Sequence, residues 1–470
     1  MASEADKAKS LAQRMAEFAF VVRYDSIPGE VVAAARRHFA DTLACALGAR
    51  NAPIILALRK DAIATGGHAD ATIIGTAEKV PAAVAALING AMVRHLDGND
   101  IFVMNRGGAS GHFSDGTAGL LALAERYRRT GEELLTCLVA SYELQGALAE
   151  SLDFWQRGLH PVTSVVWVVP IVAARLSGAT PVEAVHACGL AVATGTVRNT
   201  WIRPAQTVPI IKSVAAGLAV KHALEAAELA MLGVTATEDA LETVLAPGDT
   251  QPPPTFNPAP IDRLGQRWSL TRNMLKLYPA QINTQAAIEA TIRLYQRGVR
   301  AEHVRKLVLH GHRNVAAGVQ GSAQAFAPAN RESADHSTPY VMAMALLRGR
   351  LTPEEYESAP WRSAEAKALM AKIELRVDFQ LDQAFIAGGM LGVRLVAELI
   401  DDRTETIVVH QPKGHPDEPL SETDLLEKLS WLLPAPARAL TPRRLLDLCN
   451  RLATVEDVRE LIENCNITDS

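Results

Sequence analysis

The segment Ala246–Pro260, "APGDTQPPPTFNPAP", contains six prolines and decides how the chain is divided. Proline lacks a backbone N–H and fixes φ, so neither a helix interior nor a central strand accommodates such a run. A chain of 470 residues also exceeds the usual size of a single hydrophobic core. We therefore interpret this segment as the crossing from one domain to another.

The residues before the crossing carry helical patterns with clear start signals. Thr130 and Glu133 fit a capping box, in which a hydroxyl and a carboxylate each accept from a free backbone N–H of the first turn. The segment 214–233, "VAAGLAVKHALEAAELAMLG", has an apolar face at the helical period, and its small side chains indicate closely packed helices. Residues 1–260 are therefore predicted to form the first part of a large all-helical domain.

Beyond the crossing the periodicity changes from helix to strand. Residues 373–379 alternate apolar and polar side chains, as in a half-buried strand. Residues 393–410 have the pattern of a β-hairpin, and residues 304–312 are a further strand candidate. We therefore expect a smaller α/β domain at residues 261–410.

The last part of the chain returns to a helical pattern. Helix start signals stand at Ser421, Thr441 and Thr454. Residues 411–470 are therefore predicted to rejoin the helical domain. The expected fold class is mainly α, with a smaller α/β domain inserted into a large helical one.

Composition and charge exclude several classes of function. The net charge of −5 argues against nucleic acid or a membrane surface as the main partner, although a local basic pocket can still bind a small anion. The most apolar run, Val165–Ala174, is too short to span a membrane and contains Pro170. The N-terminus has no apolar signal segment, so we expect a cytoplasmic protein. The five cysteines show no CxxC spacing, which argues against zinc-finger and iron–sulfur sites.

The densest group of titratable side chains lies in Arg94–Gly116, "RHLDGNDIFVMNRGGASGHFSDG". It contains His95, Asp97, Asp100, His112 and Asp115. These residue types could bind a metal ion, but no HxH, HxxxH or HExxH pair places two imidazoles on one face. The serine of this stretch is not in a GxSxG elbow. An acid/base site and a polar loop between two helices remain the alternatives.

Further candidates for acid/base chemistry are spread along the chain. They are His160 in "RGLHPVTS", Lys212 in "TVPIIKSVAAG", Lys276 in "MLKLYPAQINTQ", and His336 with Tyr340 in "RESADHSTPYVMA". Each of them alone also fits a structural role, such as a capped loop, a solvated lysine or a core tyrosine. A site would need several of them together, because anionic substrates require cations as well as proton donors and acceptors.

Six blocks in order resemble the MmgE/PrpD family, which includes 2-methylcitrate dehydratases, cis-aconitate decarboxylases and iminodisuccinate epimerases. The blocks are "AALINGAMVRHLDGND", "GHFSDGTAGLLALAE", "GLHPVTS", "IIKSVAAGLAVKHALEAAELA", "LKLYPAQINTQAAIEA" and "RESADHSTPYVMAMALLRGRLTPEEYE". They spread over roughly residues 10–410. The resemblance implies a helical domain with a smaller α/β lid, a homodimer, and no metal ion or other cofactor.

The resemblance also implies site residues. The acidic active-site residue falls on Asp97 and the catalytic histidine on His112, and these two are our candidates for proton transfer. The remaining positions implied as catalytic are His160, Lys212, Lys276 and Tyr340, with His336 and Arg198 expected to contact the substrate. The sequence departs from the family pattern at Gly98, Ile101 and Phe113, where an aromatic residue, a threonine and a proline are usual.

The implied activity is dehydration of a 2-hydroxy tricarboxylate such as 2-methylcitrate. Decarboxylation of cis-aconitate and epimerisation of a substituted succinate are alternatives, because all three reactions stabilise negative charge beside a carboxylate. A non-catalytic protein that keeps the fold is a further alternative, favoured by the three departures. In each case the expected partner is a small di- or tricarboxylate, bound in a cleft that the lid closes.

Overall fold

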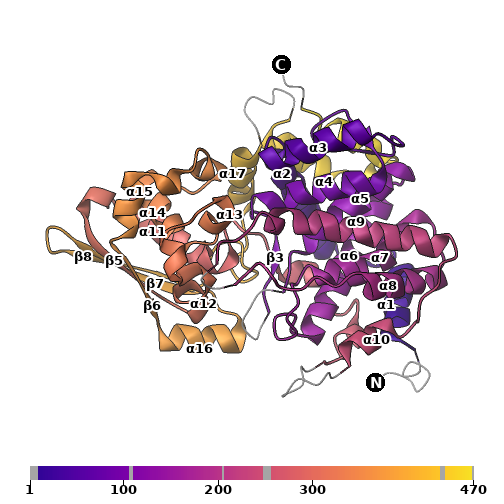
Figure 1. Cartoon of the computed structure of the whole chain (residues 1–470), viewed down its shortest axis with the longest axis horizontal. Coiled ribbons are helices and arrows are strands. Elements are labelled where there is room, and N and C mark those ends of the chain that lie inside the picture. Colours follow the sequence, from indigo (N-terminus) through magenta and orange to yellow (C-terminus); the bar gives the residue numbers. More distant parts are fainter. Residues whose placement is uncertain (1–8, 105–109, 204–205, 247–255, 434–439, 468–470) are drawn as a thin grey trace.

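The computed structural model describes residues 9–104, 110–203, 206–246, 256–433 and 440–467. Two parts lie side by side, and most of the first 245 residues form the helical part at the right of Figure 1. A four-stranded sheet with helices packed on it forms the part at the left. The proline-rich crossing falls largely outside the described residues.

The helical part consists of ten helices before the crossing and three after the sheet, counted over the described residues. They are α1 (Leu11–Val21), α2 (Gly29–Ala49), α3 (Pro53–Thr65), α4 (Ala82–His95), α5 (Thr117–Arg126), α6 (Gly131–Ser151), α7 (Thr163–Ser177), α8 (Pro181–Thr194), α9 (Ile211–Met231), α10 (Ala240–Leu245), α17 (Glu422–Leu432), α18 (Pro442–Asn450) and α19 (Val458–Glu463). The last three join the same hydrophobic core as the first ten.

The α/β part is built on one mixed sheet with the strand order β6-β5-β7-β8. Its strands are β5 (Val304–Gly311), β6 (Ile373–Val377), β7 (Val393–Leu399) and β8 (Thr404–Val409), and its helices are α11 (Gln285–Gln296), α12 (Arg313–Ala316), α13 (Arg331–Ala334), α14 (Thr338–Arg348), α15 (Ala364–Met370) and α16 (Phe379–Gly388). The pair β5 and β6 is parallel, and the other two pairs are antiparallel. A second hydrophobic core lies between this sheet and α11 and α14.

Short strands connect the two parts. The antiparallel pair β3 (Ile101–Phe102) and β4 (Asn273–Met274) joins the loop after α4 to the segment that enters the α/β part. A second short pair, β1 (Ala71–Thr72) with β2 (Lys79–Val80), lies within the helical part. The β3–β4 pair therefore holds the loop after α4 against the α/β part.

Glycines allow α4 and α9 to approach closely. A Cβ atom on Gly217 would lie 2.1 Å from the carbonyl oxygen of Leu87, and one on Gly90 would lie 2.8 Å from the Cα atom of Gly217. A side chain at either position would force the helices apart. This close packing matters because Asp97 follows α4 and Lys212 lies in the first turn of α9.

Most of the sequence-based elements are confirmed. Both partners of the capping box form their hydrogen bonds at α6, and the predicted hairpin and the strand at 304–312 are present as β7–β8 and β5. The strand predicted to reach Phe379 ends at Val377, because Asp378 caps α16 instead. The start signal at Thr454 is wrong, since α19 begins after Asp457. The domain boundaries and the movement of a lid stay predictions.

All five cysteines are buried and free. Among the described residues, no helix is both long and apolar enough to cross a membrane. The run Val165–Ala174 forms the middle of α7, with Pro170 inside the helix, and its side chains are buried in the helical core.

Candidate active site

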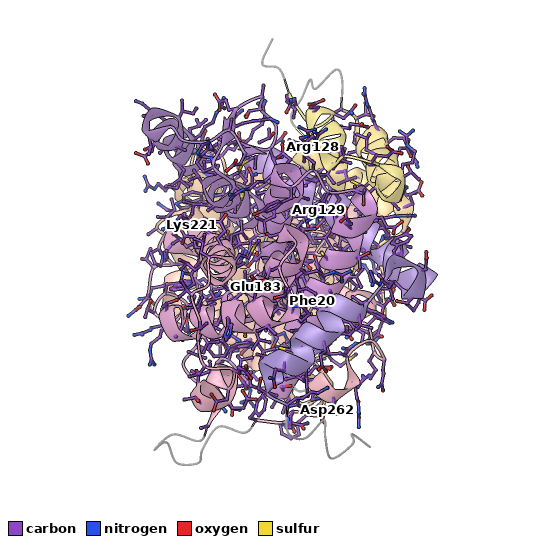
Figure 2. The ribbon with its side chains drawn as sticks, turned by 90° about the vertical axis from the view of Figure 1, so that its right-hand side faces the viewer. Phe20, Arg128, Arg129, Glu183, Lys221 and Asp262 are labelled. Atoms are coloured by element: carbon purple, nitrogen blue, oxygen red, sulfur yellow. The ribbon has the colours of Figure 1, made fainter. Side chains whose placement is uncertain are left out.

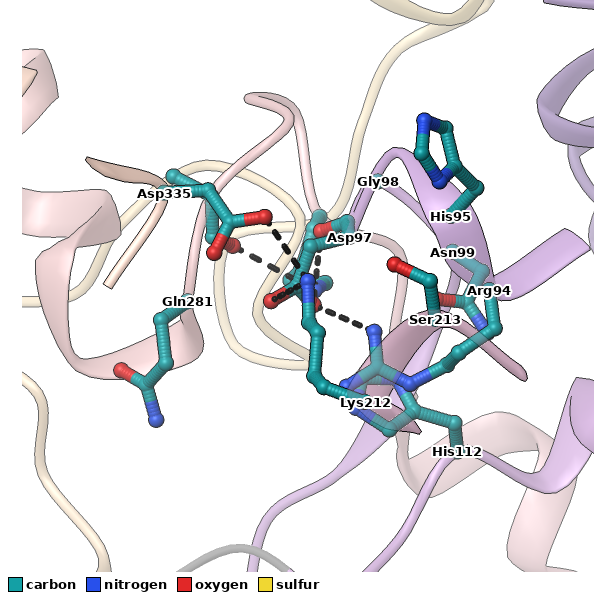
Figure 3. A network of polar contacts seen from close by, with 12 residues as sticks. Arg94, His95, Asp97, Gly98, Asn99, His112, Lys212, Ser213, Gln281 and Asp335 are labelled. Atoms are coloured by element: carbon teal, nitrogen blue, oxygen red, sulfur yellow. Dashed lines mark hydrogen bonds and ion pairs between the residues drawn. The ribbon is translucent and has the colours of Figure 1, made fainter. Parts of the chain in front are cut away.

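Asp97 lies at the centre of a buried polar cluster between the two parts. It follows the end of α4 and has a φ of 53°, a left-handed conformation that aspartate tolerates better than most residues. Its side chain is 1% exposed. The turn thereby points the carboxylate away from the helix axis and toward residues of the α/β part (Figure 3).

Three cations contact the Asp97 carboxylate. Oδ1 accepts from Nη1 of Arg94 at 2.7 Å and from Nζ of Lys276 at 2.6 Å, and Oδ2 lies 3.1 Å from Nζ of Lys212. Burial opposes ionisation, but the three cations hold the pKa of Asp97 well below its ordinary value. Asp97 is therefore ionised at neutral pH and forms ion pairs with all three cations.

Asp335 adds a second carboxylate from the α/β part. Its Oδ2 accepts from Nζ of Lys212 at 2.7 Å, and its Oδ1 lies 2.5 Å from Nδ1 of His336. Arg331 lies 3.3 Å from the same carboxylate. Burial raises the pKa of Asp335, yet Lys212 and His336 outweigh it and hold that pKa below the usual range. Four cations, Arg94, Lys212, Lys276 and Arg331, thus surround two carboxylates.

His112 presents one ring nitrogen to a cavity beside this cluster. Its Nδ1 donates to the carbonyl oxygen of Asp100 at 2.6 Å, so Nε2 carries the free lone pair of the neutral ring. Burial, with Arg94 and Lys276 nearby, lowers the pKa of His112 well below its ordinary value. At neutral pH the ring is therefore uncharged and can accept a proton.

His160 has the opposite tautomer. Its Nδ1 accepts from the backbone N–H of Val162 at 3.2 Å, which leaves the proton of the neutral ring on Nε2. The ring lies 4.8 Å from that of Trp201, and burial lowers its pKa to about 3. Where His112 offers a lone pair, His160 thus offers a hydrogen-bond donor.

Two more buried carboxyl groups lie under the cavity. Asp100 accepts from Nδ2 of Asn273 at 2.9 Å and from the hydroxyl groups of Ser114 and Tyr142. Asp115 accepts from Asn99 at 3.2 Å and faces the cavity. Burial, reinforced by the nearby Asp100, raises the pKa of Asp115 to about 7 although Arg94 opposes the shift. Asp115 is thus partly protonated at neutral pH.

The cavity has a volume of about 80 Å³, which is below the usual range of small-molecule sites. Its polar wall contains Arg94, Asp97, His112, Asp115, His160, Gln281 and His336. Its apolar wall contains Ile101, Trp155, Val162, Ile202 and Ile282. The cavity lining therefore combines charged and apolar side chains.

The structure brings most of the predicted residues together and leaves two outside. Tyr340 is fully buried in the α/β core, where its hydroxyl donates to the carbonyl oxygen of Glu355. Arg198 is exposed and does not line the cavity, although its backbone pairs with Leu159 beside His160. Arg94, and not Arg198, is the arginine that lines the cavity.

Sequence reasoning missed Arg94 and Asp335. Arg94 stands three residues before Asp97 at the end of a helix, the spacing at which opposite charges meet, so the ion pair was readable. Asp335 precedes His336 in a block that we singled out for its neighbours. Gln281, which lines the cavity, carried no signal of its own.

A metal ion is one possible occupant of the cluster. Among the described residues, Asp97, Asp335 and His336 offer ligand atoms that lie within 4.8 Å of one another. However, Lys212 already contacts both carboxylates, so a divalent ion would lie against an ammonium group. The donor set thus fits a metal poorly, and of the five candidates in Arg94–Gly116 only Asp97 is part of it.

Of the three departures from the family pattern, one faces the cavity. Ile101 lines its apolar wall. Phe113 is fully buried and stacks on Phe102 at 5.0 Å. A Cβ atom on Gly98 would meet Cys45 and Pro279 at ordinary contact distance. The departures therefore change the shape of the cavity through Ile101 and leave the polar wall in place.

Comparison with known proteins follows the same division of the chain. The MmgE/PrpD N-terminal domain matches residues 13–245, and the MmgE/PrpD C-terminal domain matches residues 278–447. The chain is 29% identical over 409 residues to 2-methylcitrate dehydratase of Escherichia coli (strain K12), covering 80% of each chain. It is 28% identical over 428 residues to the enzyme of that name from Cupriavidus necator, covering 84% of each.

A relative with a different name matches over a longer region. Human cis-aconitate decarboxylase is 25% identical over 452 residues, covering 90% of this chain and 89% of its own. The relatives thus carry two different activity names on one sequence pattern. Because both family domains match in order and together cover most of the sequence, this chain belongs to the MmgE/PrpD family.

Proposed function

We propose that the protein is a hydro-lyase that removes water from a 2-hydroxy tricarboxylate such as 2-methylcitrate. The observation that carries the proposal is an excess of positive charge: the buried Arg94, Lys212 and Lys276 and the half-buried Arg331 surround only two carboxylates. An anionic substrate would balance that excess, which is costly to leave uncompensated in a buried site. The relatives named 2-methylcitrate dehydratase support this substrate class.

His112 is the proposed base. Its free Nε2 would take the proton from the carbon next to a substrate carboxylate, and the electron pair left on carbon would form the new double bond. The cations and the Nε2–H of His160 would stabilise the negative charge that develops on the carboxylate. Because the pKa of His112 is depressed in the empty site, bound carboxylates would raise it toward the range that proton transfer needs.

Asp115 is the proposed acid. Its carboxyl group faces the same cavity as His112 and comes from the same short turn. As the C–O bond breaks, the proton of Asp115 would go to the departing hydroxyl group, which leaves as water. The sequence favoured Asp97 for proton transfer, but a carboxylate with a strongly lowered pKa is a poor base. Asp97 is therefore proposed to position the cations of the site.

The direct test is to incubate the purified protein with 2-methylcitrate, citrate, cis-aconitate and iminodisuccinate. Dehydration appears as ultraviolet absorbance of a new conjugated double bond, decarboxylation as released CO₂, and epimerisation as a change in optical rotation. The Lys212→Met variant is the matched control. Turnover of 2-methylcitrate by the native protein alone is the expected result, and CO₂ release from cis-aconitate would replace the proposal with the decarboxylase alternative.

The decarboxylase alternative rests on the human relative, which covers more of the chain than the dehydratases do. The epimerase alternative needs the same cations and proton donors. A non-catalytic protein would bind a tricarboxylate tightly and turn over none of the four acids. Calorimetry with tricarballylate, which lacks the leaving hydroxyl group, separates this last alternative from a protein that has no carboxylate site.

We propose further that the reaction needs no metal ion. The ammonium group of Lys212 occupies the position between Asp97 and Asp335 that a divalent ion would need. Activity should therefore survive EDTA and exposure to air. Loss of activity on chelation, restored by one divalent ion, would assign Asp97, Asp335 and His336 as its ligands instead.

We also propose a cytoplasmic homodimer. Three exposed leucines lie along α9 and at its C-terminal cap. They are Leu218, Leu229 and Leu232, which are 46%, 45% and 80% exposed. An apolar face of this kind is typical of an interface. Light scattering on the native protein and on a Leu218→Glu, Leu229→Glu variant tests it: the native protein should be dimeric and the variant monomeric. A native monomer would end the dimer proposal.

A further inference from the structure

A second and larger cavity lies outside the candidate active site. It has a volume of about 290 Å³ and is lined by the second half of α6, by the segment 257–272 and by Met104 after β3. Neither His112 nor any residue of the Asp97 cluster lines it. The acid/base mechanism therefore makes no use of this cavity.

The lining of this cavity is rich in arginine. Arg263, Arg267 and Arg272 face it together with the carboxylates of Glu143 and Glu150. Both oxygens of Glu143 are occupied, since they accept from the backbone N–H groups of Gly265 and Ser269 at 2.9 and 2.8 Å. Glu150 forms its ion pair with Arg272. Neither carboxylate is thus left to pair with the other two arginines.

Arg263 and Arg267 are exposed, and neither has a side-chain partner among the residues that the structure describes. Asp262, the acid next to Arg263, is directed to Arg14 and lies at the lower edge of the helical part (Figure 2). Two unpaired guanidinium groups on one cavity are suited to an anion with more than one charge, because each can form paired hydrogen bonds to a carboxylate or phosphate group.

The cavity is also connected to the active site through direct contacts. Arg272 lies over the ring of Phe102 at 5.3 Å, and that ring stacks on Phe113, the neighbour of His112. Asn273, which follows Arg272, donates to Oδ2 of Asp100 at 2.9 Å. The backbone carbonyl of Asp100 in turn holds the ring of His112. Two short chains of contacts thus connect Arg272 to His112, the proposed base.

From these contacts we propose that this cavity is a regulatory site for a small multivalent anion, carrying phosphate or carboxylate groups. The anion pairs with Arg263 and Arg267 and competes with Glu150 for Arg272. The neighbouring Met104, Ala147, Ala259 and Pro260 supply apolar contacts to the body of the ligand. Occupancy changes the position of the β3–β4 pair and thereby the reactivity of His112.

Calorimetry with pyrophosphate tests binding without any assay of activity. The test variant is Arg263→Ala, Arg267→Ala, and the matched control is Arg305→Ala, Arg403→Ala, which removes the same charge from exposed residues of the α/β part. The native protein and the control should bind pyrophosphate alike, and the test variant about 100-fold more weakly, since two charge-assisted contacts are lost. Equal binding by all three proteins, or none by the native protein, overturns the proposal.

Two further arms complete the experiment. Tricarballylate identifies a carboxylate ligand: two equivalents should bind the native protein and one the test variant, whereas one equivalent in both assigns the cavity to phosphate groups. Steady-state kinetics with and without pyrophosphate then measures the coupling, which should shift KM or kcat in the native protein and not in the test variant. Binding that leaves both constants unchanged refutes the regulatory role. Failure of the proposed reaction itself leaves the calorimetry intact.

Discussion

Lys428 on α17 donates a hydrogen bond of 2.7 Å to the carbonyl oxygen of Gly98, which lies 330 positions earlier in the chain. The preceding carbonyl, that of Asp97, accepts from Lys276. Two buried lysines from distant segments thus hold two consecutive carbonyl groups and, with them, the left-handed turn at Asp97. Asp41 on α2 balances the charge of Lys428 at 2.5 Å. The final helices of the chain therefore act on the geometry of the site.

Replacing Lys428 by methionine should destabilise the protein by about 3–5 kcal/mol, because it leaves Asp41 buried without its partner. Turnover should fall as well, since the turn at Asp97 loses one of its two anchors. Urea unfolding and steady-state kinetics measure the two effects. The double variant Asp41→Asn, Lys428→Met is the control, which should regain stability but not turnover. A single variant as stable as the native protein would contradict the assignment.

Replacing His112 by alanine should lower kcat by ~10²–10⁴-fold and leave the unfolding transition nearly unchanged, the usual effect of losing a general base. The control is His68→Ala, at an exposed position outside the site, which should keep full activity. Steady-state kinetics on the preferred acid measures both. Full activity in the His112 variant would remove this residue from the mechanism.

The pH dependence should report Asp115. Its pKa is raised to about 7 in the folded protein, so the native state binds this proton more tightly than the unfolded state does. Stability contributed by the proton is therefore complete below the unfolded pKa and is lost as pH rises toward 7. Asp115→Asn has no such titrating group. It should therefore raise the free energy of unfolding above pH 7 by up to roughly 4 kcal/mol and leave it unchanged at acidic pH.

The pH dependence of activity should depend on Asp115 as well. If Asp115 donates the proton to the departing hydroxyl, kcat should decline as pH rises through about 7, and Asp115→Asn should lose turnover at every pH. Paired pH profiles of kcat and of unfolding free energy check both statements. An active Asp115→Asn variant would move the acid role to Lys276, whose pKa burial lowers to about 8.

Much of the fold could be predicted because it rests on local patterns. The capping box at Thr130, the hairpin at 393–410 and the glycine-rich faces of α4 and α9 each depend on residues close in sequence. The sequence-based prediction of element ends fails where a helix cap interrupts another local pattern. Asp378 caps α16 and ends a strand whose alternation would otherwise reach Phe379, and Asp457 begins α19 in place of Thr454.

The candidate site was less predictable because its residues meet only in three dimensions. Asp97, His112, His160, Lys212 and Lys276 were each recognised through the resemblance, but no sequence pattern shows that three cations converge on one carboxylate. Tyr340 illustrates the reverse case: its position was carried over by motif, yet its hydroxyl donates to the carbonyl oxygen of Glu355 inside the core. Which side of an element a side chain occupies depends on tertiary packing.

Ile101 should control which acid is preferred. It lies on the apolar wall of the cavity, 4% exposed, with Ile282 beside it in one apolar cluster. An apolar wall binds an alkyl branch better than a hydrogen, with about 10–200-fold discrimination per methylene. Ile101→Thr should therefore lower the ratio of kcat/KM for 2-methylcitrate to that for citrate, whereas Ile101→Val should keep it. An unchanged ratio in both variants would exclude Ile101 from specificity.

Substrate entry should require the two parts of the molecule to separate. Asp97 and Lys212 come from the helical part and Lys276 and Asp335 from the α/β part, and all four side chains are at most 2% exposed. A tricarboxylate cannot reach them while the cluster is closed, so an open form must be populated. Closure over the ligand would also exclude water from the charged intermediate.

Small-angle scattering with and without tricarballylate measures this opening. The radius of gyration should decrease when the ligand binds, because the ligand's carboxylates draw the cations of both parts together. Lys276→Met is the informative variant: it removes the lysine that reaches Asp97 from the α/β part, so KM should rise and the contraction should be lost. Lys306→Met, at a half-buried lysine of the sheet that pairs with Glu374, is the control. A radius that ligand leaves unchanged, together with a native KM in Lys276→Met, would show that the two parts are rigidly joined and that substrate enters by local loop movement.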